Sequence, residues 1–485
     1  MKIKSILEVV AALLFITPIF AQSLDTEIDN EVREMQAAYN VPGLSVVVVQ
    51  GNRIIVCKAY GLSNVEHHTS FTSDTPSRLA SATKFFTSLA LLSEAQKGTI
   101  NLDAPLKKYF QGIQPEWADI PVYQLVNLTS GIPGTEKTLF DKMSDNEQRK
   151  VSENDLFEML RNLPLESNPG EKWAYRQTGY MTASLIISKL TGKSWQDIVR
   201  EDILIPAGAT NTGHNDVTVY PSGQEPKNYV HDESGKFINA PMFFPEVLAT
   251  GAGYNTSAHD LSNIFLAINS HKILSPELLA QYEFNKVYMF RRGENDYYSI
   301  ASEVERFGPY LTMGHSGGPD LADIRYCPEK QVGVAVLANR NNTGISAALT
   351  NRILKRLLLD SAFSVQKRPI GLAIRELVGK SNDRQLTEYY DNNKKNPGYH
   401  YVDSESDLNS AGYELLGSGN VVDALKIFRL IVKAFPESAN AFDSLGEAYL
   451  KAGDKQNALV NYKRAYDLNP ENENARKIIE ELSSH

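Results

Sequence analysis

Two serines in this 485-residue chain stand in patterns that are typical of catalytic nucleophiles. Ser316 lies in the segment GHSGG at 314–318, which matches the G-x-S-x-G pattern of a nucleophile elbow. Ser81 begins the segment SATK, in which Lys84 follows three residues later. On a helix, that spacing places the two side chains on one face, where the amine can take or hold the hydroxyl proton. Both patterns point to attack on a carbonyl group.

The surroundings of Ser316 do not fit an elbow. An elbow serine sits between a strand and a helix, and its acid and histidine partners follow in chain order. Residues 320–340 instead have the composition of a strand hairpin, and the later histidines are His400, in a polar segment, and His485, the last residue. We therefore expect Ser316 to contact a substrate rather than to attack it.

The surroundings of Ser81 fit a catalytic serine better. The S-x-x-K pattern alone is weak, because SVQK at 364–367 also matches it, inside a polar connector. Ser81 instead begins a long apolar helix that ends near Gly98. The amide groups at a helix N-terminus favour developing negative charge. The context therefore favours Ser81 over Ser364.

The elements that would position these residues indicate an α+β fold. Apolar residues at helical spacing predict a helix before Pro42, and LSVVVVQ and RIIVCKAYG around Gly51-Asn52 predict a β-hairpin. QVGVAVLANR at 331–340 has strand composition, and a helix is predicted from Ile345 to Leu359. Short helices and loops fill residues 100–270. Strands at both ends with helices between them predict an antiparallel sheet joined to an α-helical insertion.

Five segments resemble, in the same order, the class C-like branch of the serine β-lactamase and penicillin-binding protein superfamily. They are SRLASATKFFTSLALLSEAQKGTINLDAPLKKYF, LVNLTSGIPG, NPGEKWAYRQTGYMTASLIISKLTGKSW, GAGYNTSAHDLSNIF and GHSGG. The branch contains β-lactamases, esterases and D-peptidases. The resemblance implies a β-lactamase-like antiparallel sheet flanked by helices, with an α-helical subdomain.

The resemblance also implies roles for individual residues. Ser81 would attack the carbonyl of a β-lactam, a D-amino-acid peptide or a small ester, and water would hydrolyse the acyl-enzyme. Either Lys84 or Tyr175 would be the general base. The backbone N–H groups of Ser81 and Gly318 would hold the oxyanion. His315, Ser316 and Gly317 would form the third box of the superfamily and line the cleft.

Three residues depart from the pattern of the branch. His315 replaces the usual lysine, and with an ordinary pKa near 6.5 it would be mostly neutral at pH 7. Gln177 replaces the usual asparagine, which leaves open its contact with Lys84 or with a substrate amide. Leu128 also stands where a histidine is usual. Gln177 and Leu128 support an alternative, in which the hydrolase domain is weak or inactive and the protein serves in binding, whereas His315 makes β-lactam hydrolysis less assured than the acyl-enzyme chemistry.

The C-terminal part of the chain contains a repeat. Two 34-residue units starting at Glu405 and Ala439 align four pairs of residues in the tetratricopeptide pattern: Gly412 with Gly446, Ala424 with Ala458, Phe428 with Tyr462, and Pro436 with Pro470. We therefore predict two tetratricopeptide repeats with a capping helix over 405–485, preceded by a helical connector over 361–404. The repeats would recruit a protein partner.

The N-terminus predicts export. Lys2 and Lys4 precede an apolar stretch that ends at Phe20, so residues 1–21 resemble a signal peptide, with an uncleaved anchor as the alternative. The hydrolase domain would then cover 22–360, in a periplasmic or extracellular protein with no membrane span after signal removal.

Composition limits the other classes of function. The net charge of −9 argues against nucleic-acid binding. No His or Cys spacing indicates a metal site, and we expect no cofactor. Cys57 and Cys327 are far apart in the sequence, and we expect both to be free.

Overall fold

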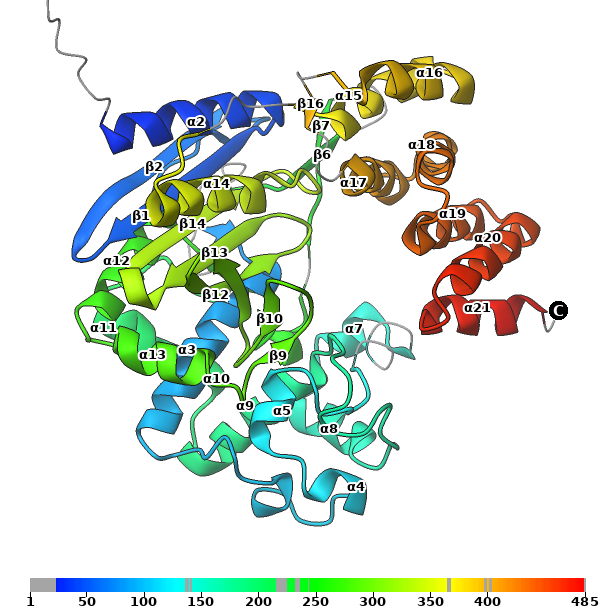
Figure 1. Ribbon diagram of the computed structural model, residues 1–485. Coiled ribbons are helices and arrows are strands. Elements are labelled where there is room, and N and C mark those ends of the chain that lie inside the picture. The colour runs from blue at the N-terminus through cyan, green and yellow to red at the C-terminus, as the bar shows by residue number, and fades with distance from the viewer. Residues whose placement is uncertain are drawn as a thin grey trace, which may run out of the picture.

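The computed structural model describes residues 23–135, 139, 142–214, 225–231, 236–242, 244–363, 368–396, 399–400 and 404–483. A nine-stranded antiparallel sheet forms its centre, in the strand order β3-β2-β1-β14-β13-β12-β11-β10-β9 (Figure 1). The strands are β1 (Gly43–Gln50), β2 (Arg53–Asn64), β3 (Thr69–Ser70), β9 (Phe290–Arg291), β10 (Asp296–Tyr298), β11 (Glu303–Phe307), β12 (Tyr310–Gly317), β13 (Ala322–Cys327) and β14 (Val332–Ala338). The predicted signal peptide at 1–21 lies outside the described residues.

The predicted hairpin forms β1 and β2, and β1 also pairs with β14 from the other end of the domain. The valines of β1 alternate between two hydrophobic cores: Val46 and Val48 pack in one, and Val47 and Val49 in the other. Because both faces of the strand are covered, its sequence is a continuous apolar run rather than an alternating one. The predicted α+β class is confirmed.

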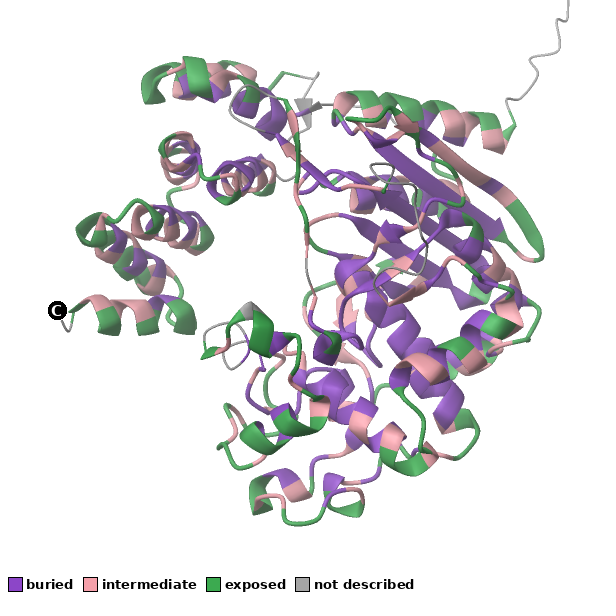
Figure 2. Ribbon diagram, turned by 180° about the vertical axis from the view of Figure 1, so that it is seen from behind, coloured by how far each residue is buried: buried purple, intermediate pink, exposed green. Residues whose placement is uncertain are grey.

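Helices cover both faces of the sheet. α2 (Leu24–Ala38) and α14 (Ile345–Leu359) pack on one face, and α3 (Lys84–Gln96) and α12 (Ala258–Asn269) pack on the other. Figure 2 shows the strands buried between these layers. The helix predicted from residue 345 to residue 359 has the same bounds in the structure.

Shorter elements surround the sheet and supply the predicted helical insertion. Its helices are α4 (Pro115–Ala118), α5 (Val122–Val126), α7 (Asp145–Gln148), α8 (Glu153–Leu160), α9 (Thr178–Thr191), α10 (Trp195–Val199), α11 (Ile205–Ala207) and α13 (Pro276–Glu283). Short strands form two small sheets: β4 (Ser77–Arg78), β8 (Tyr254–Thr256) and β5 (Gly213–His214) in one, β6 (Tyr229–His231) and β7 (Phe237–Asn239) in the other.

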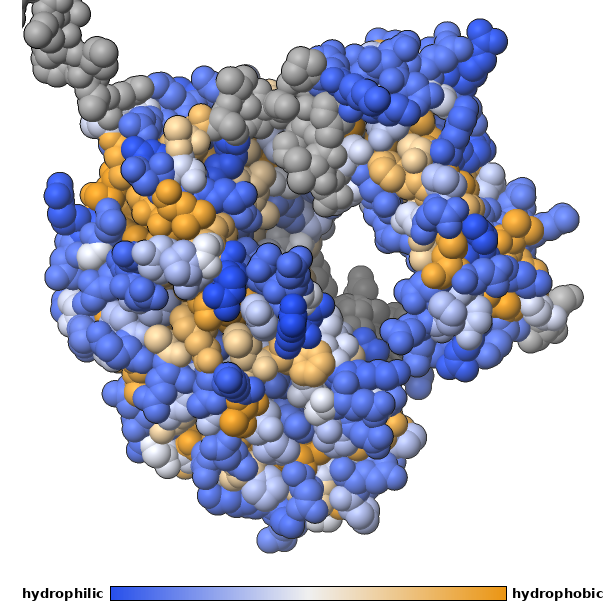
Figure 3. Space-filling view, in the orientation of Figure 1, coloured by the Kyte–Doolittle hydropathy of each residue, from blue (hydrophilic) through white to orange (hydrophobic). Residues whose placement is uncertain are grey.

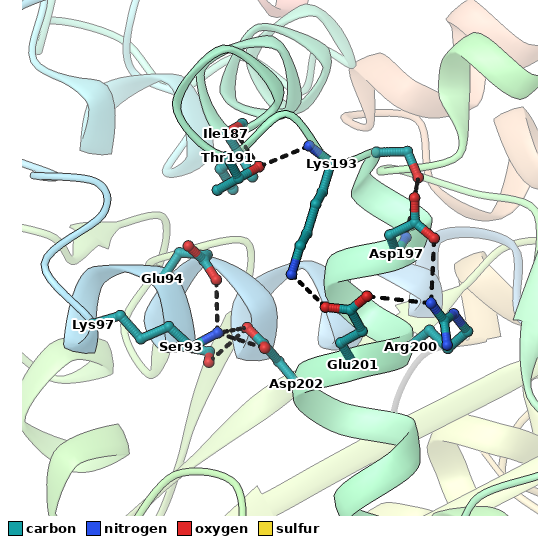
Figure 4. Close-up of polar contacts among 11 residues, drawn as sticks. Ser93, Glu94, Lys97, Ile187, Thr191, Lys193, Asp197, Arg200, Glu201 and Asp202 are labelled. Atoms are coloured by element: carbon teal, nitrogen blue, oxygen red, sulfur yellow. Dashed lines mark hydrogen bonds and ion pairs between the residues drawn. The ribbon is translucent and has the colours of Figure 1, made fainter.

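Ion pairs hold the C-terminal end of α3 against the turn that follows α10 (Figure 4). Lys97 lies 2.5 Å from Asp202, which also accepts a hydrogen bond of 2.9 Å from Ser93. Lys193, after α9, pairs with Glu201 at 2.5 Å. Both acidic residues belong to a π-helical turn, a feature that is rare in proteins. The contacts of Lys97 and Ser93 with Asp202 hold the far end of the helix that carries Lys84 against this turn.

The C-terminal part of the chain is helical. It contains α15 (Ile370–Leu377), α16 (Asp383–Asn393), α17 (Ser404–Gly417), α18 (Val421–Ala434), α19 (Ala439–Lys451), α20 (Lys455–Leu468) and α21 (Glu473–Ser483), with a short parallel pair of β15 (Arg368–Pro369) and β16 (Tyr399–His400). One hydrophobic cluster joins α15 to α19, and a second joins α19 to α21. These helices leave the body as a curved arm (Figure 1). No helix in the described part of the chain is long and apolar enough to cross a membrane.

Candidate active site

Ser81 lies in a tight turn that leads into α3. The sequence predicts that the helix starts at Ser81, whereas the structure has a 3-10 turn over Ala80–Thr83 and starts the α-helix at Lys84. Ala80, immediately before the serine, has a φ of 43° in the left-handed region. A non-glycine residue pays strain energy for that conformation, and such strain is often found at functional sites. The turn leaves the Ser81 side chain half-buried at the surface of the site.

Tyr175 contacts the hydroxyl group of Ser81. The tyrosine oxygen lies 2.9 Å from Ser81 Oγ, with Tyr175 as the donor. Tyr175 lies in the irregular segment before α9, which is held in place where the Ala174 N–H donates to the Leu128 carbonyl at 2.9 Å. The distance between the two oxygens allows direct proton transfer.

Lys84 is fully buried beside the same tyrosine. Its ammonium group donates to the Gly251 carbonyl at 2.7 Å and lies 4.8 Å from the centre of the Tyr175 ring. It also lies 5.0 Å from the centre of the Tyr180 ring. A cation above an aromatic face is attracted by the ring quadrupole. Lys84 is therefore fixed between two tyrosines of one segment and the backbone before β8.

Gln177 is part of this arrangement. A Cβ atom placed on Gly251 would lie 2.0 Å from Gln177 Oε1 and 3.4 Å from Lys84 Nζ. The glutamine amide, the lysine and the bare glycine backbone are therefore packed together, and no side chain fits at residue 251. The structure brings Ser81, Lys84, Tyr175 and Gln177 together.

The end of β12 packs against the turn that holds Ser81. A Cβ atom on Gly317 would lie only 2.0 Å from the Leu79 carbonyl oxygen, so the close approach requires glycine there. Gly318 follows directly. This contact brings the predicted third box next to Ser81, where the Gly318 N–H is expected to hold the oxyanion.

His315 is buried and uncharged. Its Nδ1 lies 2.6 Å from the Ser316 carbonyl, which can only accept, so Nδ1 carries the proton and Nε2 accepts from Tyr298 Oη at 3.1 Å. Tyr298 Oη in turn lies 2.6 Å from Tyr180 Oη. Burial lowers the pKa of His315 to about 4, although the nearby Glu303 raises it. The imidazole is therefore neutral at pH 7, because burial lowers its pKa well below the ordinary value of 6.5.

Ser316 is bound to Glu303. Its hydroxyl donates to Glu303 Oε1 at 3.1 Å and its N–H donates to Oε2 at 3.0 Å, while Arg325 holds the same carboxylate at 2.8 Å. Burial raises the pKa of Glu303, but the charge and hydrogen bond of Arg325 and the hydrogen bond from the Ser316 N–H outweigh it and hold the pKa well below its usual range. The Ser316 hydroxyl, which matched a nucleophile pattern in the sequence, thus donates a hydrogen bond to the Glu303 carboxylate.

A family model described as Beta-lactamase matches residues 28–358, which is most of the chain. The chain belongs to the beta-lactamase family. The match begins in α2 and ends in α14, so the family's characteristic region includes the whole sheet and every site residue described above.

Individual relatives are more distant. Protein flp of Staphylococcus aureus (strain NCTC 8325 / PS 47) is 27% identical over 340 residues, which cover 66% of this chain and 63% of that protein. The chain therefore spans less than two thirds of the length of the curated relatives that it matches first. A D-amino acid amidase from Ochrobactrum anthropi SV3 has a TM-score of 0.57 at 22% identity, covering 69% of this chain and 98% of the amidase.

A third relative has the same fold. An octameric penicillin-binding protein homologue from Pyrococcus abyssi has a TM-score of 0.58 at 23% identity, covering 73% of this chain and 81% of that chain. At these identities the solved structures establish the beta-lactamase fold and nothing finer.

Sequence reasoning missed three side chains and one glycine of this beta-lactamase-family site. Tyr180 and Gly251 lie inside segments that resemble family boxes, so those segments could have pointed to them. Tyr298 and Glu303 lie in β10 and β11, which no box covers. Only strand pairing brings them beside His315, and the sequence carries no local signal for that pairing.

Proposed function

We propose that this protein is a serine hydrolase that forms an acyl-enzyme at Ser81 with an amide or ester substrate. The observation that carries the proposal is the 2.9 Å contact between Tyr175 Oη and Ser81 Oγ, with the Lys84 ammonium 4.8 Å from the tyrosine ring centre. A nucleophile in direct contact with a proton-transferring group, itself beside a cation, is the arrangement that acyl transfer requires.

Ser81 Oγ attacks the substrate carbonyl carbon while its proton passes to the Tyr175 oxygen. We assign the base to Tyr175, because it touches the serine, whereas Lys84 donates to Gly251. This step requires Tyr175 as the tyrosinate, which becomes neutral when it takes the serine proton, and the positive charge of Lys84 stabilises that anion beforehand. The N–H groups of Ser81 and Gly318 stabilise the oxyanion.

Tyr175 then returns the proton to the leaving amine or alcohol as the tetrahedral intermediate collapses. Tyr175, again a tyrosinate, takes a proton from the water molecule that attacks the acyl-enzyme, and it passes this proton to Ser81 Oγ as the acid leaves. The cycle needs no cofactor or metal ion in this proposal.

Among substrates, D-amino-acid amides and peptides are the first to test, with small esters next. One solved structure with this fold is a D-amino acid amidase. β-Lactams come third, because His315 is neutral and the third box therefore offers an anionic β-lactam no cation. A chromogenic cephalosporin and matched D- and L-amino-acid p-nitroanilides would rank these classes.

We further propose that the domain belongs to the class C-like branch, that the protein is exported to the periplasm or outside the cell, and that α17–α20 are two tetratricopeptide repeats. The 34-residue spacing supports the repeats, because α18 and α20 have matching bounds at that offset. Gly412 faces Phe428 as Gly446 faces Tyr462, with Cβ positions 2.7 and 3.0 Å from the rings.

The alternative is a binding protein whose hydrolase domain turns over slowly or not at all. The neutral, buried His315 and the Gln177 substitution favour it. Replacing Ser81 with Ala separates the two functions: the hydrolase loses turnover of an activated ester, whereas full residual activity in the variant would reject Ser81 as the nucleophile.

A further inference from the structure

The strand β12 continues past the end of its neighbour β11. Glu303, the first residue of β11, pairs with Gly314, so the following residues of β12 have no β11 residue opposite them. Side chains meet the backbone instead: Ser302 Oγ accepts from the Gly314 N–H at 2.9 Å and donates to the Gly314 carbonyl at 3.3 Å. Backbone groups need such partners wherever a neighbouring strand is missing. The third box therefore lies along an edge where side chains or a substrate meet the strand.

The backbone of Ser316 is bonded by side chains in the same way. His315 Nδ1 donates to the Ser316 carbonyl at 2.6 Å. On the donor side, the Ser316 N–H lies 3.0 Å from Glu303 Oε2, and the Ser316 hydroxyl lies 3.1 Å from Glu303 Oε1. Both donors of Ser316 therefore end on the two oxygens of one carboxylate.

Arg325 on β13 adds a third donor to that carboxylate, with Nη2 at 2.8 Å from Glu303 Oε2. A backbone N–H, a hydroxyl and a guanidinium that converge on one carboxylate make strong, charge-assisted hydrogen bonds. The same Nη2 also lies 3.1 Å from Glu305 and 3.0 Å from Asp323, whereas Nε and Nη1 have no hydrogen-bond partner among the described residues. The donors around Ser316 thus form an anion-binding group, and the anion that they hold is part of the chain itself.

Glu303 is charged and lies close to solvent. Although burial raises its pKa, Arg325 and the Ser316 N–H hold the pKa well below its usual range, so the carboxylate is ionised at pH 7. Its side chain is 14% exposed, compared with 4% for Arg325. Ser316 is half-buried and Gly318 is exposed. The negative charge therefore lies where the end of β12 opens to solvent.

A substrate at Ser81 can reach this end of β12. Gly317 packs against the turn that holds Ser81. Two residues later, the Pro319 carbonyl accepts from the Asn342 N–H at 2.7 Å, in the loop whose Arg340 is paired with the arm. Figure 3 shows an opening between the arm and the body. The arm therefore leaves room for a substrate on this side of the molecule.

We propose that Glu303 determines substrate specificity by filling the anion-binding donors around Ser316, so that the enzyme accepts substrates with a neutral group beside the scissile bond and rejects those with a carboxylate there. A substrate carboxylate would find these donors taken and would lie against a like charge, which disfavours it. An uncharged amide or ester group meets no such repulsion. The inference rests on the proposed acyl-enzyme at Ser81 and names its substrate class.

Two thioesters that differ in one group test this specificity: N-acetyl-D-alanyl thioglycolate, which carries a carboxylate, and N-acetyl-D-alanyl thioglycolamide, which carries a carboxamide. Acylation joins the acetyl-D-alanyl group to Ser81 Oγ, breaks the carbon–sulfur bond and releases the thiol with the serine proton, and a chromogenic disulfide detects the thiol. Ser81→Ala supplies the background rate. The wild-type protein should turn over the carboxamide with a kcat/KM at least about tenfold higher, a small part of what a like-charge contact can cost. Equal values for the two thioesters would overturn the proposal.

Glu303→Gln removes the charge and keeps the shape of the side chain. It should raise kcat/KM for the carboxylate thioester about tenfold and leave the carboxamide within about twofold, because only the charged substrate is repelled. The matched control is Glu305→Gln, which removes the same charge beside Arg325 from a residue that pairs with Thr312 rather than with the third box. It should keep the wild-type ratio. An unchanged ratio in Glu303→Gln, or an equal shift in both variants, would reject Glu303 as the determinant.

A second measurement does not depend on catalysis. In the full-length Glu303→Ala protein the donors around Ser316 are released, so sodium propionate should bind there and raise Tm, whereas propionamide should not. At matched ionic strength, propionate should leave the Tm of the wild-type protein unchanged. Equal responses of the two proteins to propionate, or no response in either, would show that these donors are no anion site. If neither thioester is turned over and a fluorophosphonate leaves Ser81 unlabelled, the proposed function fails, and the propionate result alone decides whether Glu303 fills an anion site.

Discussion

The carboxylate of Glu414 and the guanidinium of Arg340 form a buried ion pair, with both carboxylate oxygens 3.3 Å from Arg340 Nη2. Each side chain is 1% exposed. Arg340 also donates to the Tyr39 carbonyl at 2.6 Å, and the His231 N–H donates to Glu414 at 3.0 Å. One polar cluster thus joins the C-terminal arm to the sheet, the helix α2 and the strand β6. The arm is attached to the body by more than a linker.

Replacing Glu414 with Ala should destabilise the whole protein. The change leaves the Arg340 charge buried without its carboxylate, and breaking a buried pair in this way costs about 3–5 kcal/mol. The measurement is the free energy of unfolding in urea, with Asp467→Ala as an exposed control. A loss no larger than that of the control would mean that the arm and the body are energetically separate.

Tyr175→Phe and Lys84→Met should each lower kcat/KM by about 10²–10⁴, the usual contribution of a proton-transferring group. Phenylalanine keeps the ring that packs beside Lys84 and removes only the oxygen that touches Ser81. Tyr310→Phe, at the other end of β12, is the matched control and should keep full activity. If Tyr175→Phe also keeps full activity, the base must be Lys84.

Gly317→Ala should slow acylation of Ser81 by about 100-fold, because a misplacement near 1 Å at the reacting atoms has that effect. The added methyl group would overlap the Leu79 carbonyl and push β12 away from the Ser81 turn. Gly417→Ala is the control, since its Cβ meets no atom within 4 Å. The readout is the rate at which a fluorophosphonate labels Ser81. An unchanged rate would show that acylation does not depend on the close contact between Gly317 and the Leu79 carbonyl.

Glu283 should make the protein less stable as pH rises. Burial raises its pKa to about 8 from the ordinary 4.5, and Ser88 on α3 donates to it. Between those values the folded state holds a proton that the unfolded state has lost, so the stabilisation present below pH 4.5 is lost as pH rises toward 8. Glu283→Gln should reduce this slope by up to about 1.4 kcal/mol per pH unit. The measurement is the free energy of unfolding in urea at pH 5 to 8. Equal slopes against pH for the wild-type protein and Glu283→Gln would contradict the claim that Glu283 is protonated when buried.

Local signals predicted much of this fold. The hairpin around Gly51, the helix from Ile345 to Leu359 and the placement of Ser81 with Lys84 follow from periodicity, turn residues and ordered family segments. These features depend on residues near in sequence. The α+β class followed because strands could be recognised at both ends of the domain.

Contacts between distant segments could not be predicted in the same way. Glu303 reaches Ser316 only through the register of β11 and β12, and Glu414 reaches Arg340 only after the arm has docked. A glutamate in a strand or a helix is ordinary in sequence, since its burial depends on what packs over it. The 3-10 turn at Ser81 was missed because it depends on β12 packing against Leu79.

The central claim is that Ser81, and not Ser316, is the residue that becomes acylated. The most direct test is peptide mass spectrometry after reaction of the full-length protein with a fluorophosphonate and, separately, with a fluorescent penicillin. We predict a fluorophosphonate adduct on the peptide that contains Ser81, absent in Ser81→Ala, and a weaker penicillin adduct at the same residue. An adduct on the Ser316 peptide, or an unmodified Ser81 with both reagents, would contradict it.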